Sequence, residues 1–100
     1  MKKKNLDTIL DILKRNKDIM SQRHGVTDIA VFGSYVSGTQ SKKSDLDIFV
    51  GLKQSHKTFD NYMELKFFLE KITSMTIDLV IKESVRKELK PAIFREAVHA

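Results

Sequence analysis

The feature that most constrains the fold is the stretch from Val31 to Val50, VFGSYVSGTQSKKSDLDIFV, in which a polar loop joins two short apolar runs. Short runs rich in β-branched and aromatic residues, bounded by glycine and polar residues, are typical of strands. The first run stops at Gly33-Ser34, and the second follows Asp45-Leu46-Asp47. The stretch therefore predicts two strands, with polar groups where each strand meets the loop.

The two aspartates are expected to act together. Side chains at positions i and i+2 of a strand point to the same face, so a strand from about Ser44 to Gly51 would place Asp45 and Asp47 side by side. Two close carboxylates repel each other, and a hard divalent cation such as Mg²⁺ removes that conflict. The alternative interpretation is a pair of solvated residues that merely end a turn and begin a strand.

Gly33 and Ser34 suggest a place for phosphate. A glycine at a strand end lets a ligand approach the backbone closely, and Ser34 could cap a short helix ending at Gly38. The N–H groups at a helix N-terminus bind phosphate. A Gly-Ser pair alone is usually an ordinary strand-to-turn junction. Combined with an acidic pair on the next element, it indicates a metal–nucleotide site.

The arrangement GS-x10-DxD, from Gly33-Ser34 to Asp45-Leu46-Asp47, resembles the signature of the polymerase-beta-type nucleotidyltransferase superfamily. A third carboxylate on a later strand completes the site of that superfamily, and Asp78 within Thr76–Ile81 is the candidate. The short chain is similar to the minimal nucleotidyltransferases of prokaryotes, over about Val26 to His99. Many of those proteins are antitoxins paired with a HEPN-domain ribonuclease toxin.

The resemblance implies a role for each of seven residues. Asp45, Asp47 and Asp78 would be catalytic and would bind two Mg²⁺ ions, while Gly33, Ser34, Ser44 and Lys43 would contact the nucleotide, ATP. Many family members carry a basic residue just before the second glycine of the GS-x-x-x-G segment, where this chain has Ser37. Lys42 or Lys43 would then supply that charge to the triphosphate.

The resemblance also implies a reaction and a partner. Family membership implies transfer of AMP from ATP to a tyrosine hydroxyl of a cognate HEPN ribonuclease toxin, which inactivates the toxin, within a heteromeric complex. One alternative is a module that neutralises the toxin by contact alone. Another is nucleotidyl transfer to a small molecule.

Composition limits the other classes. One hundred residues are expected to form one domain, residues 1–100, and the absence of cysteine excludes disulfides and cysteine-based zinc sites. No apolar run reaches the roughly 18 to 20 residues of a membrane-spanning helix, so we expect a cytoplasmic protein. The net charge of +5 is spread along the chain without interleaved aromatic residues, and we do not expect direct nucleic-acid binding.

The resemblance implies the polymerase-beta-type nucleotidyltransferase fold, an α/β (α+β) fold with a small mixed sheet of three or more strands flanked by helices, and hydrophobic periodicity predicts the elements themselves. The expected helices cover residues 5–21, 58–72 and 92–98, and the expected strands cover 28–32, 44–51 and 76–82. A strand–helix–strand connection makes the last two strands parallel, which brings Asp47 and Asp78 to the same end of the sheet. For Asp78 the alternative is an edge strand that faces water. His24, His56 and His99 are expected at the surface.

Overall fold

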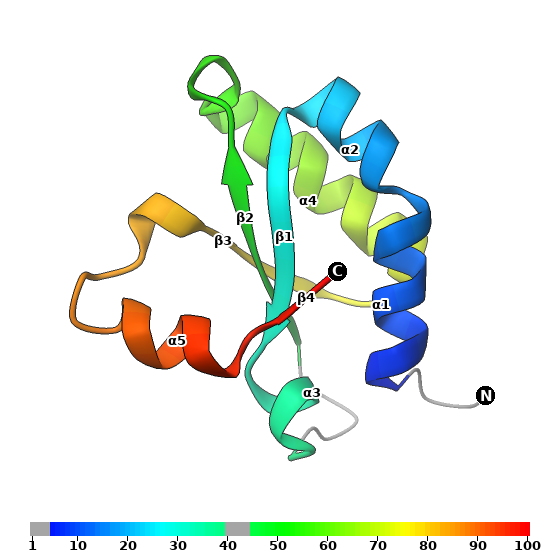
Figure 1. The fold of residues 1–100 in the computed structure, drawn as a ribbon. Coiled ribbons are helices and arrows are strands. Elements are labelled where there is room, and N and C mark those ends of the chain that lie inside the picture. The colour runs from blue at the N-terminus through cyan, green and yellow to red at the C-terminus, as the bar shows by residue number, and fades with distance from the viewer. Residues whose placement is uncertain (1–4, 40–44) are drawn as a thin grey trace.

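The computed structural model describes residues 5–39 and 45–100, and it shows a four-stranded sheet with helices on both faces (Figure 1). The strands are β1 (Val26–Phe32), β2 (Leu46–Leu52), β3 (Ile77–Ile81) and β4 (Val98–His99). The α-helices are α1 (Leu6–Arg15), α2 (Lys17–His24), α3 (Ser34–Ser37), α4 (Phe59–Thr73) and α5 (Lys90–Glu96). Two 3₁₀ turns, η1 (Gln54–His56) and η2 (Lys82–Ser84), follow β2 and β3.

The sheet is mixed, in the order β3-β2-β1-β4. Strand β2 pairs antiparallel with β1 and parallel with β3, and β4 pairs antiparallel with the other side of β1. The long connection through α4 makes the parallel pairing possible, because a tight turn can join only antiparallel neighbours. This topology confirms the predicted fold class and the predicted direction of β3.

The main core lies between one face of the sheet and the helices α1, α2 and α4 (Figure 1). Alternate residues of β2, Leu46, Ile48 and Val50, point into this core and are fully buried. They meet Leu65 and Leu69 of α4, which are also fully buried. The apolar side chains of α4 therefore pack toward the core, except that Phe59 at the start of the helix is 76% exposed.

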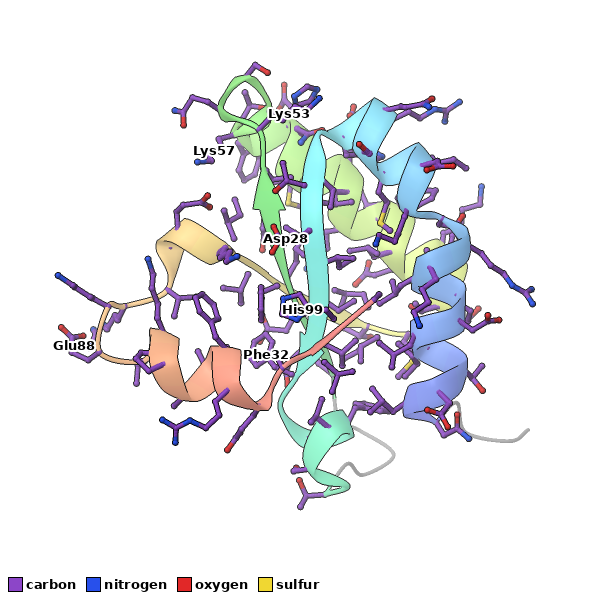
Figure 2. All side chains as sticks on the ribbon, in the orientation of Figure 1. Asp28, Phe32, Lys53, Lys57, Glu88 and His99 are labelled. Atoms are coloured by element: carbon purple, nitrogen blue, oxygen red, sulfur yellow. The ribbon has the colours of Figure 1, made fainter. Side chains whose placement is uncertain are left out.

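The opposite face of the sheet carries α5 and a smaller aromatic cluster. The ring of Phe49 packs against Phe32, Phe94 and His99, with centroids 5.9, 5.1 and 5.8 Å away. Phe32 and His99 lie together on this face in Figure 2, with Asp28 further along β1. Asp28 holds Lys82 of η2 in an ion pair at 3.0 Å, and Lys82 also lies 5.4 Å from the centroid of the Phe94 ring. These contacts hold α5 on the sheet.

The helix predicted over residues 5–21 is broken in two at Asn16. The Asn16 side chain donates to the carbonyl of Ile12, and its backbone lies outside the helical region at φ −107° and ψ 7°. Asparagine competes in this way for the helix's own backbone acceptors. The second helix ends at Gly25, in the left-handed region that glycine adopts without strain.

The final helix was also predicted wrongly at its C-terminal end. Helix α5 ends at Glu96, because Ala97 turns to an extended conformation, and Val98 and His99 then form β4. The free edge of β1 supplies the partners for this two-residue strand. At the other end, Pro91 lies in the first turn of the helix, where its missing N–H group costs no hydrogen bond.

One of the three histidines departs from the expected surface position. His24 is only 8% exposed: its Nδ1 lies 3.3 Å from Oδ1 of Asn61, and its ring packs against Phe68. Asn61 also donates to the carbonyls of His24 and His56, at 2.8 and 2.9 Å.

Among the helices of the described ranges, none combines the length and the apolar character needed to cross a membrane.

Candidate active site

Asp47 and Asp78 lie opposite each other on neighbouring parallel strands. They are direct partners in the β2–β3 register, and both point to the face opposite the main core, since Leu46, Ile48, Ile77 and Leu79 point into it. The two carboxyl groups are close enough for the charge of Asp78 to act on Asp47. Asp78 is solvent-exposed on an edge strand, as the alternative interpretation required, yet it also faces Asp47.

The electrostatics of this pair favour a bound cation. Burial, together with the charge and hydrogen bond of Asp78 and the charge of Asp45, raises the pKa of Asp47 from 3.8 to about 6. A carboxylate in this position is destabilised by its like-charged neighbours, and a divalent ion between the oxygens would remove the repulsion. The chemistry of the two side chains therefore fits Mg²⁺.

Asp45 stands apart from this pair. It is exposed and directly precedes β2, which begins at Leu46 and not at the predicted Ser44. Strand alternation therefore does not fix its side chain beside Asp47. Within residues 5–39 and 45–100, no three His, Cys, Asp or Glu side chains are grouped so as to hold a metal ion. The negative charge of Asp45 does contribute to the raised pKa of Asp47, as the smallest of its causes.

Gly33 connects the end of β1 to Asp47. Its φ of +76° and ψ of −147° are rare for other residues, and a Cβ built on it would collide with Oδ2 of Asp47. The Gly33 carbonyl accepts from the N–H groups of Val36 and Ser37, and so begins helix α3. The turn was predicted, but Gly33 and not Ser34 occupies the capping position.

The remaining nucleotide-binding candidates divide into two groups. Ser34 is the first residue of α3 and is half-buried beside Gly33, with a backbone N–H that the first turn of a helix leaves without an internal partner. Ser44 and Lys43, with Lys42, lie outside the described residues. Ser37 is exposed, and its hydroxyl lies 2.8 Å from that of Thr39.

A cavity of about 210 Å³ lies elsewhere, between α2 and β1. Its lining residues are Lys17, Asp18, Met20, Ser21, Val26, Thr27, Asp28 and Ile29. None of the candidate site residues that the structure describes is among them. The cavity therefore does not bear on how the carboxylates or the Gly33 turn are used.

The comparison with known families decides the classification. A profile of the nucleotidyltransferase domain matches residues 13–99, nearly the whole chain. The chain belongs to the nucleotidyltransferase family. The match spans the Gly33 turn and all three candidate aspartates, and it agrees with the mixed four-stranded sheet of this nucleotidyltransferase.

Relatives of similar length support the same assignment. Protein adenylyltransferase MntA of Thermococcus cleftensis is 35% identical over 94 residues, which cover 94% of each chain. The solved structure of a protein assigned as a minimal nucleotidyltransferase covers 98% of both chains with a TM-score of 0.82 at 26% identity. A toxin–antitoxin crystal structure with AMP-PNP matches with a TM-score of 0.66 at 26% identity, covering 93% of this nucleotidyltransferase and 69% of that chain.

Two side chains near the site carry contacts that sequence reasoning missed. The hydroxyl of Tyr62 donates to the carbonyl of Leu79 at 2.6 Å, and Oε2 of Glu70 accepts from the N–H of Ile77 at 3.2 Å. Both residues belong to α4 and are half-buried. A glutamate close to an apolar helix stripe is the signal that could have drawn attention to this edge of the sheet.

Proposed function

We propose that this nucleotidyltransferase transfers AMP from ATP to a tyrosine hydroxyl of a cognate HEPN-domain ribonuclease toxin, and thereby inactivates the toxin. The observation that carries the proposal is the facing pair Asp47 and Asp78 beside the Gly33 turn. The likeness to MntA and to a toxin–antitoxin structure containing an ATP analogue supports the nucleotide and the partner.

The site residues would divide the work between metal and phosphate binding. Asp45, Asp47 and Asp78 would hold two Mg²⁺ ions, which supply charge neutralisation around the α-phosphate. Gly33 and Ser34 would hold the β- and γ-phosphates, and Ser44 and Lys43 would contribute further contacts to the nucleotide. The residues act mainly by positioning and charge, as in other phosphoryl transfers.

The proposed reaction is a nucleophilic substitution at the α-phosphorus of ATP. The tyrosine oxygen forms a bond to the α-phosphorus while the bond to the α–β bridging oxygen breaks, and pyrophosphate leaves. The phenolic proton passes to a carboxylate, for which Asp78 is the candidate because it is exposed and belongs to a strand at the edge of the sheet. An exposed position lets an acceptor carried by a second protein reach it.

The test is label transfer from [α-³²P]ATP, with Mg²⁺, to the purified product of the neighbouring gene as the candidate toxin, with ribonuclease activity measured in parallel. Asp47→Asn and Asp78→Asn should each reduce transfer by about 100-fold or more, the scale for losing one electrostatic group of a preorganised site. Asp60→Asn, at an exposed aspartate of α4, is the matched control and should transfer at the normal rate. Toxin inhibition without any label on the toxin would instead establish neutralisation by contact alone.

A further inference from the structure

Strand β3, which carries Asp78, lies at the edge of the sheet. Within the described part of the chain, β2 is the only strand beside it. The carbonyl of Thr76 accepts from Leu46 of β2, so alternation turns the backbone groups of Ile77 and Leu79 away from β2. Outward N–H and C=O groups on an edge strand need other partners when they are partly buried.

Helix α4 supplies those partners through two side chains. Glu70 binds the outward N–H of Ile77, and Tyr62 binds the outward carbonyl of Leu79. The two contacts flank Asp78, one residue before it and one after it. Ile77 and Leu79 are only 2% and 4% exposed, so their side chains also anchor this segment in the core.

We propose that Tyr62 and Glu70 are positioning residues, which hold β3 against α4 so that the exposed carboxylate of Asp78 stays opposite Asp47. The consequence for catalysis rests on the proposed function of Asp78. Each side chain makes one hydrogen bond of the kind that a neighbouring strand would otherwise make to β3. Neither side chain touches the reacting atoms. Without these two contacts, β3 is hydrogen-bonded only to β2. The strand can then shift, and Asp78 can move away from its partner Asp47.

The first test measures the strand directly, in metal-free protein, by hydrogen–deuterium exchange over β3. Exchange there should be faster in Tyr62→Phe and in Glu70→Leu than in the wild type. Glu70→Gln should restore slow exchange, because the amide Oε1 still accepts from Ile77. Glu64→Leu, at an exposed position on the same helix, is the control and should exchange like the wild type.

The second test measures the effect on the reaction with the same variants. Tyr62→Phe and Glu70→Leu should lower kcat for AMP transfer by about 10- to 100-fold, the usual cost of losing a group that orients a metal ligand. They should also raise the Mg²⁺ concentration needed for half-maximal rate, while KM for ATP stays unchanged. Glu70→Gln should recover most of the lost rate, which a general loss of folding would not allow.

The proposal is overturned if β3 exchanges in Tyr62→Phe and Glu70→Leu as it does in Glu64→Leu, or if Glu70→Gln loses as much rate as Glu70→Leu. Failure of the proposed function looks different. A wild-type chain that transfers no label would refute the transferase, and the exchange measurement would still decide whether Tyr62 and Glu70 hold the strand.

Discussion

The Cα of Gly33 faces the carboxylate of Asp47 so closely that any side chain at position 33 would collide with Oδ2. The turn expected to grip phosphate and the carboxylate expected to bind metal are thus in direct contact. The GS and DxD halves of the motif are separated by ten residues in sequence, and the fold brings Gly33 of one half against Asp47 of the other.

Replacing Gly33 with alanine should therefore damage the site more than the fold. We expect Gly33→Ala to lower AMP transfer by about 100-fold, since it displaces a preorganised charged group. The strained φ should add a stability loss of about 1 kcal/mol or more. Gly38→Ala is the matched control: Gly38 has a similar φ of +78°, but a Cβ there would have no atom within 4 Å. Equal losses of activity in both variants would show that backbone strain, and not contact with Asp47, is responsible.

The raised pKa of Asp47 predicts how stability depends on pH in the absence of metal. The folded protein holds a proton on Asp47 up to about pH 6, whereas the unfolded chain loses it near 3.8. The free energy of unfolding should therefore fall as pH rises from about 4 to about 6, and stay lower above that. Asp47→Asn should remove this dependence and stabilise the protein at pH 7.5 by about 1 kcal/mol, allowing for solvent screening of a half-buried group.

Denaturant titrations in EDTA between pH 4.5 and 8 would measure this effect. The variant and the wild type should differ least at the acidic end of that range. A wild-type protein that gains stability steadily from pH 4.5 to 8 relative to Asp47→Asn would contradict the predicted sign. Adding Mg²⁺ at pH 7.5 should stabilise the wild type more than the variant.

Asn61 should be more important for stability than its half-buried, polar character suggests. Its amide donates to two backbone carbonyls, those of His24 and His56, and so joins α4 to the ends of α2 and η1. Asn61→Ala leaves these acceptors without that donor, at a cost of about 1 to 3 kcal/mol. Gln22→Ala, at an exposed position of α2, should change the free energy of unfolding by less than about 0.5 kcal/mol. Chemical denaturation of the two variants decides between these values.

Truncating a side chain on the buried face of α4 should reduce the stability of the fold far more than truncating one on the exposed face. Leu65 is fully buried against the sheet, and Leu65→Ala should destabilise the fold by about 2 to 5 kcal/mol. Phe67 is 58% exposed, and Phe67→Ala should stay within about 0.5 kcal/mol of the wild type. Thermal melts would reveal the difference, and a large loss at Phe67 would mean that this face is covered by another surface in solution.

The alternation and periodicity of the sequence were sufficient to predict three strands of the sheet and the parallel pairing of β2 with β3. They were sufficient because those patterns report which face of an element is apolar, and a long helical connection leaves little freedom in strand direction. The same reasoning placed Asp47 and Asp78 at one end of the sheet, where the register makes them partners. It did not fix Asp45, because β2 begins only at Leu46.

The sequence alone therefore determined which face of each element is apolar. It also determined that Asp47 and Asp78 lie on the opposite strand face and that Gly33 ends the first strand. Only the tertiary structure decided the burial of His24, the strand β4, and the contacts of Tyr62 and Glu70 with the edge of β3. The physical reason is that each of these depends on which hydrogen-bonding partner a backbone or side-chain group finds. Such partners often come from segments far away in the chain, and local periodicity carries no record of them.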